Sequence, residues 1–158
     1  MADGPVRHAL GEVVLDEVSL APASPEQEHE RRVAVSDLLK SNSFEPAGGQ
    51  GGPYALRIGL VEDRLALDIS GPGLQVRHIL SLSPFRRIVR DYLTVCRSYR
   101  DAMKAAGPAQ IEAIDMGRRG LHNEGADLLI ERLKGKVDID PPTARRLFTL
   151  LCALHWRG

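Results

Sequence analysis

Residues that could bind an anion or move a proton are concentrated in one glycine-rich segment in the second half of the chain. The segment reads Asp115-Met116-Gly117-Arg118-Arg119-Gly120-Leu121-His122-Asn123-Glu124-Gly125. Arginine makes bidentate contacts with carboxylates and phosphates, and histidine and glutamate can exchange protons near neutral pH. Glycine costs about 1 kcal/mol relative to alanine inside a helix. The three glycines of this segment therefore indicate a break or the close approach of another group.

A functional interpretation of this segment is an anion- or substrate-binding site. Arg118 and Arg119 would hold the anion, and the polar side chains that follow would supply contacts or proton transfer. Those side chains are His122, Asn123 and Glu124. The candidates for catalysis are His122, Glu124 and Asp115. The glycines would allow a ligand to approach the backbone.

A structural interpretation fits the same residues. In a continuous helix Asp115, Arg118 and His122 lie inside or beside the apolar arc, where a charged group must be paired or reach a cleft. An ion pair of Asp115 with Arg118 or Arg119, together with a hydrogen-bonded His122, would satisfy that requirement. A second structural possibility is a helix break at Gly120, with the next asparagine capping a new helix.

A second set of candidate ligand-binding residues lies in the helix expected after Pro84. At 100° per residue, five cations fall within about 40° of one line: Arg86, Arg90, Arg97, Arg100 and Lys104. This pattern predicts a contact strip for phosphate groups or an acidic protein. A solvated helix face, or pairing with the acidic N-terminal half, would produce the same pattern. Aromatic residues are only 4% of the chain, which disfavours a platform for single-stranded nucleic acid.

Other motifs that carry chemistry are missing from the sequence. Cys152 and His155 could supply two metal ligands, but no second pair has zinc-site spacing. The run His29-Glu30-Arg31-Arg32-Val33 begins like a zinc protease motif and has valine where the second histidine belongs. We find no phosphate loop, dinucleotide fingerprint or nucleophile elbow. We therefore expect neither a metal site nor a cofactor.

The elements that would position these residues begin with strands. Val13-Val14-Leu15 predicts a strand within Val6–Glu17. Alternating apolar residues predict a hairpin over Tyr54–Ile69 that turns at Glu62-Asp63, and a third strand over Val76–Leu82.

Four helices are expected around these strands. Ser24, Pro25 and Gln27 form the sequence signature of a capped helix start, and this helix should extend to about Lys40. Ser83-Pro84, with Ser83 as the cap, should open the second helix. The third helix should occupy Ala109–Leu133, and the fourth should run from Asp140-Pro141-Pro142 to Trp156. The predicted fold class is α+β: a small antiparallel sheet, made of the N-terminal strand and a three-strand meander, packed against about four helices.

Length and composition limit the classes of protein that remain. The 158 residues and zero net charge fit one globular domain over residues 1–158, and 43% hydrophobic residues exclude a wholly disordered chain. No apolar run approaches the ~20 residues that span a bilayer. Two cysteines and a start without a signal-like pattern favour a reducing cytoplasm. Residues 1–79 carry 7 basic and 12 acidic side chains, and residues 80–158 carry 14 and 9. The two halves could face each other within one fold, or give a dipolar surface that orients a charged partner.

Several segments together resemble the bacterial group named uncharacterised protein family two-six-two. The segments are His78–Leu82, Ser83–Val89, Ile114–Gly125, Thr143–Leu150, Glu28–Arg31 and Gly51–Leu56. The similarity spans nearly the whole chain. It implies a small, free-standing bacterial protein that is not secreted, and it assigns no activity, cofactor or catalytic residue.

We therefore expect a cytosolic binding or regulatory protein whose Arg-rich helical surfaces hold an acidic or phosphorylated partner. We expect no membrane partner, and nucleic acid is not favoured. One alternative is an enzyme for a small anionic substrate, with Arg118 and Arg119 as the clamp and His122 and Glu124 in proton transfer. Another is a subunit of a homo-oligomer, which exposed apolar surface on the last helix would support.

Overall fold

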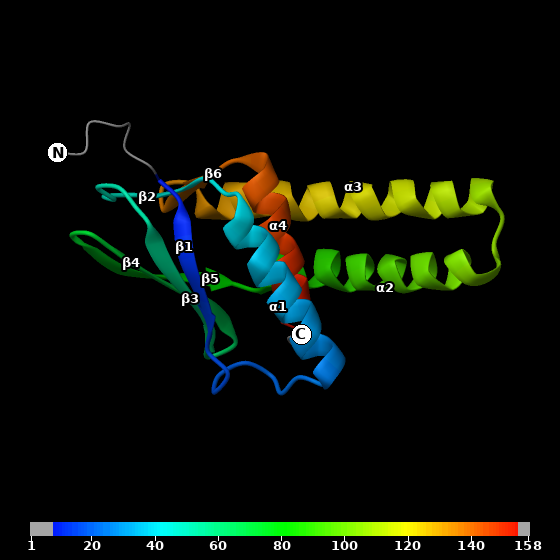
Figure 1. The fold of residues 1–158 in the computed structure, drawn as a ribbon, viewed down its shortest axis with the longest axis horizontal. Helices are drawn as coiled ribbons and strands as arrows, with labels where there is room; N and C mark the ends of the chain where they lie inside the picture. The colour runs from blue at the N-terminus through cyan, green and yellow to red at the C-terminus, as the bar shows by residue number, and fades with distance from the viewer. Residues whose placement is uncertain (1–7, 155–158) are drawn as a thin grey trace.

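The structure, a computed structural model, describes residues 8–154. Figure 1 shows a twisted sheet, two helices that cross beside it, and a long pair of antiparallel helices that extends past them. The elements in chain order are β1 (Leu10–Leu15), α1 (Pro25–Lys40), β2 (Phe44–Pro46), β3 (Tyr54–Val61), β4 (Arg64–Gly71), β5 (Leu74–Ser81), α2 (Ser83–Ala105), α3 (Pro108–Leu133), β6 (Val137–Ile139) and α4 (Pro141–Ala153). The α+β class is confirmed.

The main sheet has the strand order β1-β3-β4-β5. The meander β3-β4-β5 is antiparallel, as predicted, and its first turn places Glu62 and Asp63 at positive φ. The prediction of a wholly antiparallel sheet is wrong, because β1 pairs with β3 in parallel. The helix α1 lies between these two strands in the chain and carries it back to the end at which β1 began, so β3 runs in the same direction as β1.

Two short strands were not predicted from the sequence. β2 and β6 have three residues each and form a separate antiparallel sheet, in which Phe44 pairs with Ile139. Segments this short carry no readable alternation. Their pairing joins the chain after α1 to the chain between α3 and α4.

The helix starts follow the sequence signals with one exception. The Ser24 hydroxyl accepts a hydrogen bond from the Gln27 backbone, and the Gln27 side-chain oxygen accepts one from the Ser24 backbone, which completes the predicted capping box. Asp140 accepts from the backbone of Thr143 at the start of α4. The prediction that Ser83 caps α2 is wrong, since the cap position is Leu82 and Ser83 is already helical. The predicted end of the last helix at Trp156 and the predicted strand start at Val6 lie outside the described residues.

The hydrophobic core lies between one face of the main sheet and the helices. Alternate residues of the central strand face it, namely Leu65, Leu67 and Ile69. The helices contribute Leu38, Phe85, Leu129, Leu147 and Phe148. The apolar residues of α4 are buried through Leu154, so the exposed apolar surface that would have supported an oligomer is not found on the described part of that helix.

Candidate functional site

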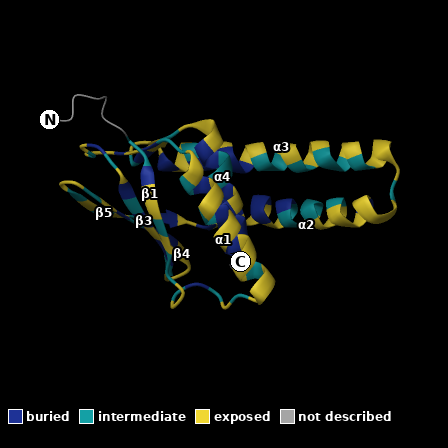
Figure 2. Ribbon diagram, in the orientation of Figure 1, coloured by how far each residue is buried: buried dark blue, intermediate teal, exposed yellow. Residues whose placement is uncertain are grey.

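The helices α2 and α3 form an antiparallel pair that positions most of the candidate residues. We call it the hairpin. Its proximal part comprises residues 83–92 and 122–133, and its distal part comprises residues 93–121. Figure 2 shows that buried positions of the hairpin gather near α1 and α4, whereas the far end is mostly half-buried or exposed, with Ala102 as a buried exception. In α3 every buried residue lies at or after Gly125. The glycine-rich segment therefore crosses the boundary between the two parts.

In the distal part, Asp115 is paired with two arginines. Arg118 donates to Asp115 Oδ1 from Nε at 3.1 Å and from Nη2 at 2.5 Å, and Arg119 Nη2 lies 2.8 Å from Oδ2. The hydrogen bond from Arg118 is the largest cause that holds the pKa of Asp115 below its ordinary value. The structure thus contains the ion pairs of the structural interpretation.

The two arginines differ in how accessible their guanidinium groups are to a ligand. The guanidinium of Arg118 lies over the ring of Tyr99, with 5.0 Å between Cζ and the ring centroid, and its side chain is 33% exposed. The side chain of Arg119 is 72% exposed. Arg118 is therefore held between a carboxylate and an aromatic face, and Arg119 has the more accessible guanidinium of the two.

His122 belongs to the proximal part and contacts α4. Its Nε2 lies 2.9 Å from the carbonyl oxygen of Arg145 and 2.8 Å from Thr149 Oγ1. The ring stacks against Tyr92 and lies tilted against Phe148. Burial lowers the pKa of His122, so the neutral ring is favoured. Because a carbonyl oxygen only accepts, Nε2 carries the proton in this arrangement.

Glu124 points to another side of α3. Residues two positions apart on a helix point in directions that differ by about 200°. Glu124 pairs with Arg87 of α2, with 2.9 Å between Oε1 and Nη2. The structure therefore does not bring His122 and Glu124 together. Asn123 is exposed, and its side chain makes no hydrogen bond to any residue of 8–154.

The glycines of the segment have separate explanations. A Cβ on Gly125 would collide with the ring of Phe148, so α3 and α4 can pack this closely only over a glycine. A Cβ on Gly117 would make ordinary contact with Val95, and one on Gly120 would meet open space. The helix continues through Gly120. The close approach is made by a core side chain of α4.

Five exposed cations form a line along α2, which we call the basic strip: Arg86, Arg90, Arg97, Arg100 and Lys104. At 1.5 Å per residue it is about 27 Å long. Within residues 8–154, Arg90 is the one member with a carboxylate oxygen within 4 Å, at 3.7 Å from Asp91. The neighbouring Arg87, by contrast, is paired with both Asp91 and Glu124. Within the described chain, no carboxylate of the acidic N-terminal half lies within 4 Å of a cation of the strip.

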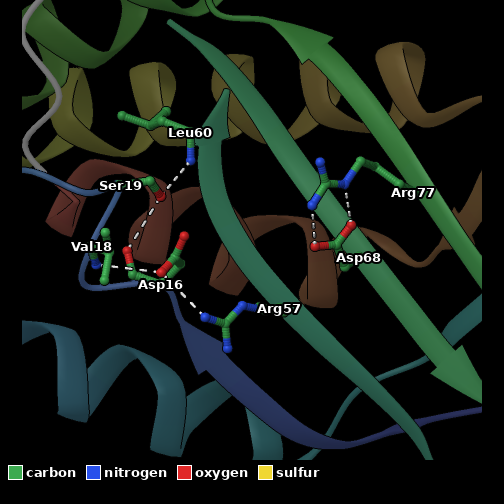
Figure 3. Close-up of polar contacts among 7 residues, drawn as sticks. All are labelled: Asp16, Val18, Ser19, Arg57, Leu60, Asp68 and Arg77. Carbon is green, nitrogen blue, oxygen red and sulfur yellow. Dashed lines mark hydrogen bonds and ion pairs between the residues drawn. The ribbon is translucent and has the colours of Figure 1, made fainter. Parts of the chain in front are cut away.

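A charged cluster on the outer face of the main sheet was not predicted (Figure 3). Arg77 donates to both oxygens of Asp68, at 2.6 and 3.0 Å, and Arg57 reaches Asp16 at 3.2 Å. The hydrogen bond from Arg77 lowers the pKa of Asp68. Strand alternation and register place Arg57, Asp68 and Arg77 in one row, so the pattern could have been found. Its charges cancel in pairs, which does not favour a site for a charged ligand.

The described residues contain few other sites for chemistry. No group of three or more His, Cys, Asp or Glu within residues 8–154 is placed to hold a metal ion. Cys152 is buried, and burial raises the pKa of its thiol, while His155 lies outside the described residues. Over the same range, none of the helices combines the length and apolar character needed to cross a membrane.

Comparison with known proteins places the chain in a family. The model of Uncharacterised protein family (UPF0262) matches residues 7–157. The chain belongs to this family. A UPF0262 protein of Phenylobacterium zucineum is 61% identical over 156 residues, which cover 99% of this chain and 98% of the relative. A UPF0262 protein of Caulobacter vibrioides is 58% identical with the same coverage, and one of Azorhizobium caulinodans is 55% identical over the full length of both chains. No solved structure matches the chain. The function of these UPF0262 relatives is unknown, so they name no activity for it.

Proposed function

We propose that this UPF0262 protein is a cytoplasmic binding or regulatory protein that uses the basic strip to hold an acidic segment of a partner protein. The observation that carries the proposal is the row of exposed cations on α2, four of which have no carboxylate partner among residues 8–154. Unpaired cations of one sign on one helix face raise the local concentration of acidic partners and orient them.

The geometry of the strip suits an extended row of carboxylates. Its members are three, four or seven residues apart, which are the separations that place side chains on one helix face. A partner helix with acidic residues at the same separations could face several of them at once. Arginine, which contributes four of the five cations, can contact each carboxylate through two parallel hydrogen bonds.

The energetics predict binding that depends strongly on salt. An exposed ion pair contributes about 0.2–1 kcal/mol, so several must act together. Charges in water are screened beyond about 8 Å at physiological ionic strength. The interaction should therefore weaken steeply as salt is added.

Other partners fit the strip less well. A small phosphorylated ligand needs donors that converge on one point, whereas these five follow a line along a projecting helix. Single-stranded nucleic acid needs exposed aromatic faces. On α2 the rings of Phe85 and Tyr92 are buried, and Arg118 covers Tyr99.

The test compares two triple variants with the same change in charge. One reverses part of the strip (Arg97→Glu, Arg100→Glu and Lys104→Glu), and the other reverses exposed cations without a carboxylate partner among residues 8–154 (Arg64→Glu, Arg132→Glu and Lys134→Glu). We measure the salt concentration at which each protein elutes from immobilised polyglutamate, and check folding by thermal unfolding. We expect the strip variant to elute well before the wild type and the control variant close to it.

Two outcomes would overturn the proposal. If both triple variants lose the same retention, net charge rather than the strip binds the acidic polymer. If the wild type is retained on heparin and not on polyglutamate, the strip binds sulfate or phosphate groups and not protein carboxylates.

A further inference from the structure

A cavity of about 1120 Å³ lies between β1 and α1, away from the hairpin. We call it the β1–α1 groove. Its lining includes Val13 and Leu15 of the strand and Arg31, Arg32, Val35 and Leu39 of the helix. It exceeds the hollow over the outer sheet face, which has about 510 Å³. The groove plays no part in the proposed function. The strand that forms one of its walls, β1, has backbone groups without a hydrogen-bonding strand beside them.

That wall is one of the two edge strands of the main sheet. β1 is the first strand in the order β1-β3-β4-β5, so only one of its sides is paired with another strand of this sheet. Leu15 is in register with Ile58, and the Asp16 backbone donates to the carbonyl of Ile58 at 2.8 Å. In a parallel pair with this register, the backbones of Val14 and Asp16 face β3. The N–H and C=O groups of Val13 and Leu15 consequently face the groove.

One end of this edge is already closed by a side chain. The Leu10 backbone donates to Asn42 Oδ1 at 2.7 Å, and Asn42 Nδ2 donates to the Leu10 carbonyl at 3.3 Å. The amide of Asn42 therefore makes the two bonds that a neighbouring strand would make. No residue of 8–154 does the same for Val13 or Leu15. Exposed strand edges are usually protected in native proteins because they pair with other chains.

The helix wall of the groove, α1, is anchored by hydrogen bonds from Arg31. Arg31 is 7% exposed and donates to the carbonyl oxygens of Ala153, Leu154 and Ala21. These bonds tie α1 to the end of α4 and to the loop after β1. These contacts oppose movement of α1 away from β1.

The remaining lining suits a peptide with alternating character. Val35 and Leu39 are half-buried and offer an apolar surface, and Arg32 is exposed at the rim without a carboxylate within 4 Å among residues 8–154. Of the other lining cations, Arg31 donates to backbone carbonyls and Lys40 lies 3.6 Å from Asp37, so Arg32 is the cation left to face an acidic side chain. An extended peptide presents successive side chains to opposite sides, so it can place one toward the apolar surface and the next toward the rim.

We propose that the β1–α1 groove binds an extended segment of a partner protein, which adds as a strand to the free edge of β1 and directs an acidic side chain toward Arg32. In this mode the main-chain hydrogen bonds supply affinity and alternate side chains supply specificity. The groove and the basic strip are separate surfaces, so each proposal stands or falls without the other.

The first test needs no ligand. In the free protein the amide hydrogens of Val13 and Leu15 should exchange with solvent much faster than those of Val14 and Asp16, which face β3. Equal protection of all four would show that the edge is already occupied, and would overturn the proposal.

The second test uses a display library of random octapeptides selected on the wild-type protein. We expect enriched peptides to be acidic and to protect the amides of Val13 and Leu15 from exchange. Binding should fall about tenfold, the effect of losing one or two hydrogen bonds, in Val13→Pro, which lacks the N–H facing the groove, and in Arg32→Glu. The control Val33→Glu adds a negative charge at an exposed residue of the same helix that does not line the groove, and should bind normally.

The remaining outcomes are decisive as well. Normal binding by the charge-reversed basic strip variant would support a separate site, and its loss would show that the peptides bind α2. No enrichment, or equal loss in Val33→Glu and Arg32→Glu, would overturn the proposal. If Val13→Pro does not fold, Arg32→Glu and the protection of the wild-type amides decide the question.

Discussion

The proximal and distal parts of the hairpin belong to the same two helices and differ in what covers them. In the proximal part a third helix packs over the pair, and both His122 and Gly125 contact α4. In the distal part Asp115 and Arg118 contact residues of the hairpin itself. Met103 lies on the same arc of α2 as buried residues and is still 57% exposed.

This difference explains where a partner could bind. Where α4 covers the hairpin, a polar side chain is buried, and leaving it without a hydrogen bond would be costly. Its hydrogen bonds are therefore made within the fold and are not available to a partner. A polar or charged group beyond that element keeps contact with water. The distal part thus offers Arg97, Arg100 and Lys104 of the basic strip to a partner. The proximal part stabilises the fold through the face that packs on α4, while Arg86 and Arg90 continue the strip on its exposed face.

The largest effect that would sharpen this comparison is expected from Gly125→Ala. Its Cβ would collide with the ring of Phe148, and overpacking of this kind costs about 1–3 kcal/mol. Gly120→Ala, in the distal part, meets open space and should raise the free energy of unfolding by up to about 1 kcal/mol. Chemical denaturation measures both changes.

A smaller core residue at the contact provides the control. Adding Phe148→Leu to Gly125→Ala should cost less than the sum of the two single changes, because the side chains compete for the same space. A Gly125→Ala protein as stable as the wild type would remove the distinction between the two parts.

The next effect is a pH dependence located in the proximal part. Burial lowers the pKa of His122 from its ordinary 6.5, so below that pH the unfolded chain takes up a proton more readily than the folded protein. The stability contributed by the neutral ring is complete above about pH 6.5 and is lost as the pH falls through the lowered value. We expect the loss of unfolding free energy between about pH 7.5 and about pH 5.5 to be smaller in His122→Gln than in the wild type.

Two histidines help to isolate this effect. His78 also has a pKa lowered by burial and contributes equally to both proteins. The exposed His29 is the matched control, and His29→Gln should keep the wild-type pH dependence. If His122→Gln keeps it too, the contacts of the ring with α4 do not control its titration.

The smallest effect is expected from Asp115→Asn in the distal part. Removing the charge releases Arg118 and Arg119, and backbone amides near position 115 should exchange faster while global unfolding changes less than in Gly125→Ala. Asp127→Asn, an exposed residue of the same helix without an ion pair in the described chain, is the control. Destabilisation as large as that of Gly125→Ala would show that the distal ion pairs hold the fold together.

The local elements were predictable because their signals are local. Ser24 and Gln27 lie within one turn of each other and cap α1 as expected. Alternation of apolar residues predicted the β-hairpin of β3 and β4 and the third strand, β5. The ion pair of Asp115 with Arg118 was one of three open interpretations, because a separation of three residues in a helix brings the two groups together in any environment.

The features that only the tertiary structure revealed are contacts between residues far apart in the chain. By itself the sequence determined the α+β class, most helix limits and the spacing of the basic strip, because helix and strand periods act over a few residues. The parallel pairing of β1, the contact of Gly125 with Phe148 and the groove beside Val13 were decided by how the elements pack. Each depends on contacts between segments that no local pattern specifies, and packing alone selects which of them meet.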